Sequence, residues 1–183
     1  MQKDVLQILT ETHAMLGWLA ERLQAARPGR SRAILFNEVA RSLGAHQTVI
    51  DRTILPALKQ GGWRGVSSDV LAGHMALKRA LAETLTLRDR AAFDAAIPWL
   101  AARLRVQCRL EQEKLVPLLR CFDDDERIVM AQDAELHLTR LLGDKRHPPD
   151  DGEVTPQAEE LVEEAYVVLR SLPQKDEHTD TTR

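Results

Sequence analysis

The chain has 183 residues and a formal net charge of −3, and 44% of its residues are hydrophobic while only 4% are aromatic. A chain of this length forms one domain, or one domain with an appendage, and can bury a sizeable core. The low aromatic content favours helix over sheet. The slightly acidic balance excludes a general attraction to nucleic acid or acidic membranes, so we expect neither as a partner.

The cysteine usage and the N-terminal sequence indicate a cytoplasmic protein. Two cysteines, Cys108 and Cys121, are too few for a disulfide framework and suit a reducing compartment. The N-terminal stretch lacks a long apolar core and carries Asp4, so we expect no signal peptide. No run of about 18 apolar residues occurs, and we therefore expect no segment that spans a membrane.

The first part of the chain predicts two long helices. The first covers residues 3–26 and ends before Pro28 and the glycine that follows it, because proline and glycine together interrupt a helix. The second covers residues 32–60, with Ser31 as its N-cap. Pro56 falls in the last turns of this helix, and we expect a kink there because proline clashes with the preceding turn.

Two further helices follow a glycine-rich turn. One is predicted over residues 68–86, and the next begins around residues 87–90 and runs to about residue 120. Pro98 lies inside this fourth helix. The sequence leaves two alternatives open: the helix kinks at Pro98, or residues 89–96 form a short separate helix.

The last part of the chain divides into a helix, a linker, a second helix and a tail. An acidic start predicts a fifth helix over residues 124–142, because negative charge is favourable at a helix N-terminus. Residues 143–155 are predicted as a linker, residues 156–173 as a C-terminal helix with one apolar stripe, and residues 174–183 as a disordered tail. We expect the C-terminal helix to dock on the domain formed by residues 1–142, or to mediate self-association or binding of a protein partner.

An offset of 61 residues relates several segments of the chain, which indicates an internal duplication. Residues 46–56 match residues 107–117, and both segments end in a proline ten residues after their first position. The same offset relates His13 to His74. The sequence therefore indicates a pair of helices followed by a copy of that pair.

Each of the first four predicted helices carries a polar residue within an otherwise apolar stripe. The stripe residues recur at spacings of three and four, which keeps them on one face of a helix. The polar residues lie near the middle of each helix, and the middles of antiparallel helices meet at one level. We therefore expect one buried layer that contains His13, His46, His74, Gln107 and Glu111.

This layer has the donor types of a metal site. Inward-facing imidazole and carboxylate groups in a helical bundle can bind a metal ion, and this combination suits iron, zinc, copper or manganese. A buried Glu111 without a partner costs several kcal/mol, and a bound cation would turn that cost into binding free energy. A single buried histidine more often bonds a backbone carbonyl, but three histidines and a carboxylate at one level favour a metal site.

Other functions find little support in the sequence. Cys108 lies beside the stripe, and we interpret it as a small buried hydrophobe and not as a ligand. No nucleophile–base pair and no phosphate-binding loop occur, so we predict no catalytic residue, and an enzymatic activity is not indicated. A ferritin-like di-iron site needs Glu-x-x-His pairs, and none of the layer histidines belongs to one.

The layer residues resemble the pattern of hemerythrin-like, or HHE cation-binding, domains over about residues 2–142. That pattern has a histidine on the first and third helices and H-x-x-x-E on the second and fourth. A proline typically follows each H-x-x-x-E motif, ten residues after the histidine. The matching positions are His13, His46, Pro56, His74, Glu111 and Pro117. The resemblance implies an all-α, up-down antiparallel four-helix bundle, here with additional C-terminal helices.

Family members hold two irons bridged by both carboxylates, and they bind dioxygen or sense oxygen and iron. This chain has Ile50 where the second helix should supply a glutamate, Gln107 where the fourth should supply a histidine, and Lys78 where some members place a further histidine.

The resemblance therefore implies a mononuclear site. In the family's arrangement, the histidines of the first two helices share one metal that the carboxylate of the fourth also reaches. His13, His46 and Glu111 would then hold one ion, with His74 as a fourth ligand or an outer partner. Iron, zinc and manganese are the candidate cations, and dioxygen is a candidate ligand. Asp51 follows the lost glutamate position and is an alternative ligand there, although a step of one residue turns a side chain about a quarter of the way round a helix, which disfavours it.

A metal-free domain that acts in protein–protein interaction or regulation is the alternative. In that case Ile50 fills the space of the missing glutamate, and Gln107 hydrogen-bonds a histidine or Glu111.

Overall fold

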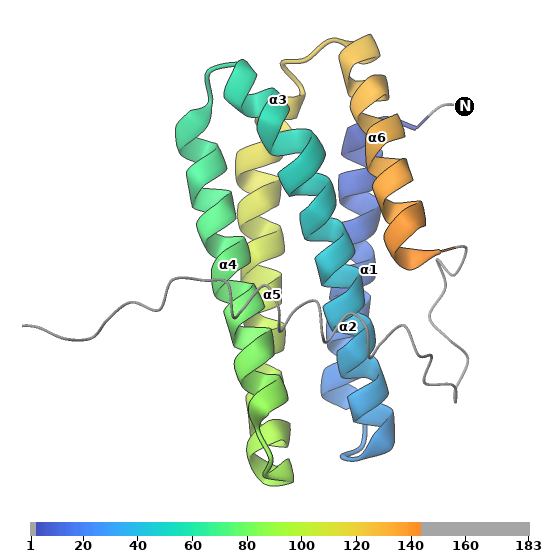
Figure 1. Ribbon diagram of the computed structural model, residues 1–183, viewed down its shortest axis with the longest axis vertical. Helices are drawn as coiled ribbons and strands as arrows, with labels where there is room; N and C mark the ends of the chain where they lie inside the picture. Colours follow the sequence, from blue (N-terminus) through green and yellow to red (C-terminus); the bar gives the residue numbers. More distant parts are fainter. Residues whose placement is uncertain (1–2, 144–183) are drawn as a thin grey trace, which may run out of the picture.

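The computed structural model describes residues 3–143, and all regular secondary structure in this range is helical (Figure 1). The predicted all-α class is therefore confirmed for this range. In chain order the elements are α1 (Val5–Ala25), α2 (Arg30–Val49), the π-helical segment η1 (Ile50–Ile54), α3 (Leu55–Gln60), α4 (Arg64–Thr86), α5 (Arg90–Leu119) and α6 (Asp124–Leu142). The predicted C-terminal helix and tail, and all but the first residue of the predicted linker, lie outside the described residues.

The long helices α1, α2, α4 and α5 lie side by side along the length of the molecule (Figure 1). α5 contacts both α1 and α4, and α1 also contacts α2. The chain reverses direction from each of these helices to the next, as the colours in Figure 1 show. α6 lies outside this group, against α1 and α2. The middles of the long helices therefore come together at a similar height.

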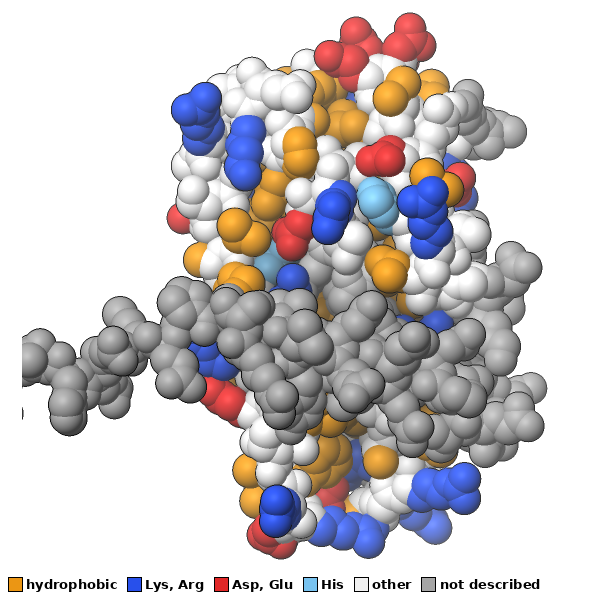
Figure 2. All heavy atoms as spheres, in the orientation of Figure 1, with side chains coloured by type: hydrophobic (Ala, Val, Ile, Leu, Met, Phe, Trp, Pro, Cys, Tyr) orange, Lys and Arg blue, Asp and Glu red, His pale blue; other side chains and the backbone are white. Residues whose placement is uncertain are grey.

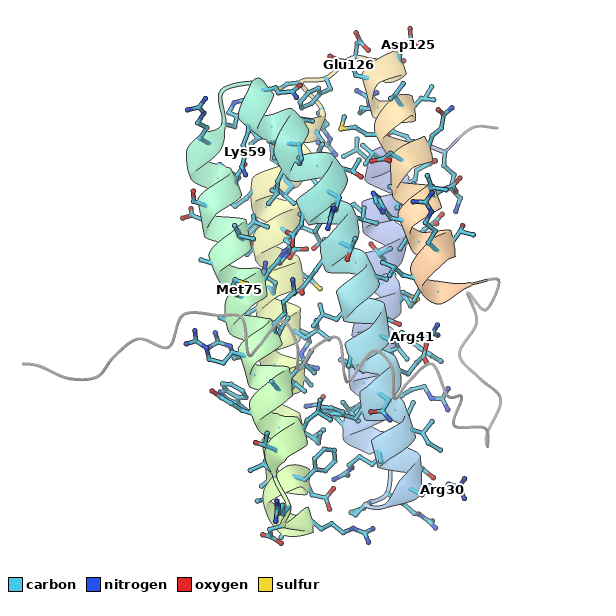
Figure 3. All side chains as sticks on the ribbon, viewed as in Figure 1. Arg30, Arg41, Lys59, Met75, Asp125 and Glu126 are labelled. Atoms are coloured by element: carbon cyan, nitrogen blue, oxygen red, sulfur yellow. The ribbon has the colours of Figure 1, made fainter. Side chains whose placement is uncertain are left out.

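Aspartates begin three of the described helices. Asp4, Asp89 and Asp123 are the N-caps of α1, α5 and α6, and the side chain of each accepts hydrogen bonds from backbone N–H groups in the first turn. Such a cap satisfies N–H groups that have no partner within the helix and contributes roughly 1 kcal/mol. The predicted acidic start of α6 is confirmed, and its side chains gather at the upper end of the molecule, where Asp125 and Glu126 are labelled (Figures 2 and 3).

Two predicted helix starts are wrong, and the structure excludes one of the two alternatives left open at Pro98. α2 begins at Arg30 after Gly29, so Ser31 is not its N-cap, and α4 begins at Arg64, before the predicted position. Neither helix has a side-chain cap, so the capping preference gave no signal for either start. Pro98 lies inside the continuous helix α5, which excludes a separate short helix before it.

The predicted second helix is interrupted by a wide turn. The backbone N–H of Leu55 donates to the carbonyl of Ile50, five residues back, whereas an α-helix uses a step of about four. Pro56 follows in the first turn of α3 and has no N–H to donate to the carbonyl of Arg52. The disturbance expected at Pro56 therefore takes the form of a π-helical turn just before it. Pro117 occupies the equivalent place in α5 without such a turn, so proline alone does not explain it.

The core consists of two apolar clusters with a polar layer between them. On α1, Leu9 belongs to one cluster and Leu16 to the other, and His13 lies between them. The same order holds on α2, α4 and α5. The apolar clusters supply the hydrophobic stabilisation, and the layer between them holds buried polar side chains at one height, among them His46, His74 and Glu111.

Hydrogen bonds hold α6 against the rest of the domain at both of its ends. Near its start, Arg127 donates to Asp4 Oδ2 at 2.9 Å. At its end, Arg41 of α2, labelled in Figure 3, donates to the carbonyl of Leu142 at 3.1 Å and also pairs with Glu38. Among the helices of residues 3–143, none has the length and apolar character needed to cross a membrane.

Candidate metal centre

Glu111 of α5 lies at the centre of the polar layer and is fully buried. Its Oε2 lies 2.8 Å from Nε2 of His13 and 2.8 Å from Nε2 of His46. Its Oε1 lies 2.9 Å from Nε2 of His74 and 2.6 Å from the amide nitrogen of Gln107. The structure thus brings all five predicted layer residues together around a single carboxylate.

The cluster is closed to solvent. The exposed fraction is 5% for His13, 1% for His46, 0% for His74 and 8% for Gln107. Bulk water therefore cannot hydrate the carboxylate of Glu111, and these four neighbours have to balance its charge. The histidines come from α1, α2 and α4, while Gln107 lies one turn before Glu111 on α5, so every long helix contributes to this balance.

Two of the three histidines also have a polar partner on their other ring nitrogen. Nδ1 of His46 lies 3.0 Å from the hydroxyl of Thr12, which can also donate to backbone carbonyls of α1. Nδ1 of His74 lies 2.8 Å from Oδ1 of Asp51. Nδ1 of His13 is buried and has no hydrogen-bond partner among the described residues. The contacts at Nδ1 therefore orient the rings of His46 and His74, whereas Nδ1 of His13 makes no such contact within residues 3–143.

Asp51 lies beside the cluster but outside the group of residues whose ligand atoms could share one ion. Asp51 lies in η1, and its carboxylate contacts Nδ1 of His74 with one oxygen. Its other oxygen, Oδ2, lies 3.7 Å from the ammonium of Lys78 on α4. Lys78 is thus paired with a carboxylate outside the cluster and is not aimed at Glu111.

A glycine makes room for Gln107. A Cβ atom added at Gly73 of α4 would collide with the side-chain amide of Gln107. The amide is held in this place by its 2.6 Å hydrogen bond to Glu111. Gly73 therefore permits the close approach of α4 and α5 at the height of the layer.

The surroundings shift the pKa values of the cluster in opposite directions. Burial would raise the pKa of Glu111, but hydrogen bonds from His13, His46 and His74 outweigh burial and hold that pKa far below its ordinary value. Burial lowers the pKa of His46, and its contact with Glu111 offsets only part of this effect. Burial acts in the same way on His74, but the hydrogen bonds to Asp51 and Glu111 prevail and raise its pKa. The cluster thus favours an ionised Glu111.

The two carboxylates beside His74 set a condition on its protons. A neutral imidazole carries one N–H, and an ionised carboxylate can only accept a hydrogen bond. With Asp51 at Nδ1 and Glu111 at Nε2, a neutral His74 would direct one lone pair at a carboxylate oxygen. The arrangement is favourable if His74 carries both protons, or if a cation lies between Nε2 and Glu111.

The donor set fits a metal ion. The ligand atoms of His13, His46 and Glu111 all lie within 4.8 Å of one another, so one ion could contact all three. Nε2 of His74 approaches the same carboxylate from the other oxygen. Imidazole nitrogens and a carboxylate form a common ligand set for divalent transition metals and zinc. The residues present can therefore hold a cation, and their chemistry does not by itself select one metal.

Cys108 lies outside this ligand set. Burial, together with the nearby charge of Glu111, raises the pKa of the Cys108 thiol to about 12, so the thiol stays protonated at neutral pH. Its side chain packs against one of the apolar clusters, as expected for a small hydrophobe.

Sequence reasoning missed three residues that support the site, namely Thr12, Asp51 and Gly73. Thr12 directly precedes His13, and only the packing of α1 against α2 reveals that it serves His46. Gly73 directly precedes His74, and a helical glycine beside a candidate ligand could have signalled a close contact with a neighbouring helix. Asp51 follows the lost glutamate position, and nothing in the sequence indicates that its carboxylate contacts His74 on the neighbouring helix.

Comparisons of the chain with protein-family models, with curated proteins and with solved structures found no match.

Proposed function

We propose that residues 3–143 form a hemerythrin-like, up-down four-helix bundle that binds one cation at the Glu111 cluster. The proposal is supported by the alternating direction of the long helices and by the match of four layer residues to the family's ligand positions. The observation that carries it is the convergence of three imidazole Nε2 atoms on the two oxygens of a fully buried carboxylate.

In this proposal His13, His46 and Glu111 hold the cation, with His74 as a fourth ligand or an outer partner. The cation would neutralise the buried charge of Glu111, which otherwise needs protons on the surrounding imidazoles. It would also relieve the conflict at His74, since a neutral His74 can direct its Nε2 lone pair at a cation while Nδ1–H donates to Asp51.

The donor set suits iron(II), zinc or manganese. Bound iron would supply redox chemistry and an affinity for dioxygen, and either property would suit a role in sensing oxygen or iron. The buried position of the cluster would restrict access to small molecules and protons. We therefore favour a sensor or cation-binding protein over an enzyme.

Metal analysis tests the proposal directly. Protein purified without chelators should contain iron, zinc or manganese, and zinc or anaerobic iron(II) added to metal-free protein should bind at about one ion per chain. The variant His46→Ala should abolish this binding. His137→Ala is the matched control, because His137 lies on α6 outside the cluster and pairs only loosely with Asp133. Failure of the wild-type chain to bind any of these ions would end the proposal.

A metal-free interaction module is the second candidate, and two contacts favour it. Gln107 donates to Glu111 at 2.6 Å, and Ile50 is fully buried within an apolar cluster, as this alternative predicts. Both residues thereby fill positions where the family places metal ligands. The chain would then act through a protein partner.

A chelator separates the two candidates. A cation that binds only the folded chain stabilises it by mass action, so removal of the cation should lower the melting temperature. A melting temperature that EDTA leaves unchanged, in protein that also takes up no added zinc or iron(II), would favour the interaction module.

A further inference from the structure

We propose that Asp51 is the positioning residue of this site: it holds the proton of His74 on Nδ1 and so turns the Nε2 lone pair of His74 towards the cation. This inference rests on the proposed cation site. It adds a residue that no pattern of ligand spacing includes, and it assigns His74 to the ligands.

The contacts of His74 leave little freedom for its ring. Its side chain is fully buried, and each ring nitrogen faces a carboxylate oxygen, 2.8 Å away at Asp51 and 2.9 Å away at Glu111. Asp51 is the more exposed of the two carboxylates, with 24% of its side-chain surface accessible, whereas Glu111 has none. Asp51 therefore lies on the outer side of the imidazole, and Glu111 on the inner side.

With a cation beside Glu111, this geometry fixes the tautomer of a neutral His74. The carboxylate of Asp51 accepts from Nδ1–H, and Nε2 then has a free lone pair. Glu111 offers no proton to that lone pair while it is ionised. A cation beside Glu111 is the partner that satisfies it. Carboxylate–histidine–metal arrangements of this kind orient the ring and raise the basicity of the ligand nitrogen.

Asp51 reaches His74 from the position that directly follows Ile50. The backbone N–H of Ile50 donates to the carbonyl of His46, four residues back, so the backbone is α-helical up to Ile50, and the five-residue step of η1 runs from Ile50 to Leu55. Ile50 returns to the face of His46 and joins an apolar cluster. The carboxylate of Asp51 contacts His74 and Lys78, so this residue faces α4 at the edge of the layer.

Lys78 holds this carboxylate in place, and Thr53 anchors the turn that carries it. The ammonium of Lys78 lies 3.7 Å from Oδ2 of Asp51, so it attracts the oxygen that does not contact His74. On the other side of η1, Thr53 donates to Oδ2 of Asp133 at 2.7 Å and ties the turn to α6. The second repeat has no such turn, and no acidic residue occupies the place equivalent to Asp51, which is Gln112.

Three variants test the role of Asp51. Asp51→Ala removes the acceptor, and Asp51→Asn keeps an acceptor oxygen but loses the charge. Asp133→Asn is the matched control, because it removes the same charge from the opposite side of η1. Zinc affinity, measured by competition with a chromogenic chelator, should fall roughly 10- to 100-fold in Asp51→Ala, less in Asp51→Asn, and remain unchanged in Asp133→Asn. Circular dichroism should show that all three variants are folded, and Asp51→Asn carries the test if Asp51→Ala does not fold.

Nitrogen-15 NMR of the histidine side chains gives a readout that needs no metal. The His74 signals, assigned with a His74→Gln variant, should show a protonated Nδ1 in the wild type both with and without zinc. In metal-free Asp51→Ala, Glu111 is the remaining carboxylate acceptor, so the proton of a neutral His74 should move to Nε2 and leave Nδ1 unprotonated. An unprotonated Nδ1 in the wild type would overturn the inference, as would a zinc affinity in both Asp51 variants equal to that of the wild type.

The same experiment separates the two proposals. If wild-type protein binds no zinc or iron(II), the cation site fails and the ligand role of His74 fails with it. A fixed Nδ1 proton that depends on Asp51 would still support the positioning contact. If zinc binds at one ion per chain and both Asp51 variants bind it with the affinity of the wild type, the cation site stands and the role of Asp51 is refuted.

Discussion

The amide nitrogen of Gln107 lies 2.6 Å from Oε1 of Glu111, one helical turn away on the same helix. This contact gives the carboxylate a donor that carries no charge and loses no proton at physiological pH. The remaining donors are three imidazoles, whose protons a cation could displace. The charged and uncharged donors around Glu111 therefore contribute differently to stability and to cation binding.

Replacement of Gly73 by alanine should destabilise the protein, although alanine is the better helix former. The added methyl group meets the Gln107 amide, and loss of its bond to an ionised group costs about 1.5–3 kcal/mol, which exceeds the helical gain of roughly 1 kcal/mol. Gly44→Ala is the control, since a Cβ there has no neighbour within 4 Å, and it should stabilise the chain. Urea denaturation of both variants measures the difference. Equal stabilisation by both substitutions would show that the Gln107 contact is unimportant.

Glu111→Gln should remove cation binding and lower stability by about 2 kcal/mol or more, because its amide group would face the N–H donors of the histidines. Glu113→Gln changes the same charge at an exposed position of α5, and we expect its effect to stay within roughly 0.5 kcal/mol. Zinc titration and thermal unfolding of the two variants test the expectation. Retention of full zinc affinity in Glu111→Gln would contradict a ligand role for Glu111.

Ile50→Glu should not create a carboxylate ligand at the position where hemerythrin-like domains have one. Ile50 is fully buried among apolar side chains, so an unpaired charge there should cost several kcal/mol. Ile50→Val, with a cost of about 0.5–1.5 kcal/mol, gives the effect of reduced volume alone. Chemical denaturation and metal stoichiometry answer the question together. A stable Ile50→Glu chain that binds a second ion would show that the apolar surroundings of residue 50 do not exclude a ligand there.

The two cysteines should differ strongly in reactivity. The pKa of Cys108 is raised from 9.0 to about 12, so at pH 8 its thiolate is about a thousandfold scarcer than in an unshifted thiol. Cys121 is exposed. Iodoacetamide should therefore alkylate Cys121 in the folded protein and both cysteines in urea, which peptide mass spectrometry can follow. Comparable labelling of both residues in the folded protein would disagree with the burial of Cys108.

The helices and the polar layer were predictable because both depend on periodicity. Spacings of three and four place His13 and its apolar neighbours on one face whatever the detailed packing, and the same holds for the other long helices. The starts of α2 and α4 were not predictable from capping residues, because neither has a side-chain cap.

The supporting residues of the site were harder to predict. Periodicity within one helix places Asp51 beside the layer, but it does not reveal that the carboxylate reaches His74 of the neighbouring helix α4. Neither the sequence of the turn nor Pro56 distinguishes a π-helical turn from a kink. Whether His13, His46, His74 and Glu111 hold a metal remains a prediction of the sequence and of the geometry, to be decided by the experiments above.

The division of the core into two apolar clusters has a consequence for the alignment of the helices. Leucine and isoleucine side chains are interchangeable enough that a purely aliphatic interior would tolerate a helix displaced along its axis by one turn. Here such a slip would press an imidazole against aliphatic groups and leave Glu111 short of a donor. The hydrogen-bonded layer therefore selects one axial alignment of α1, α2, α4 and α5 relative to one another.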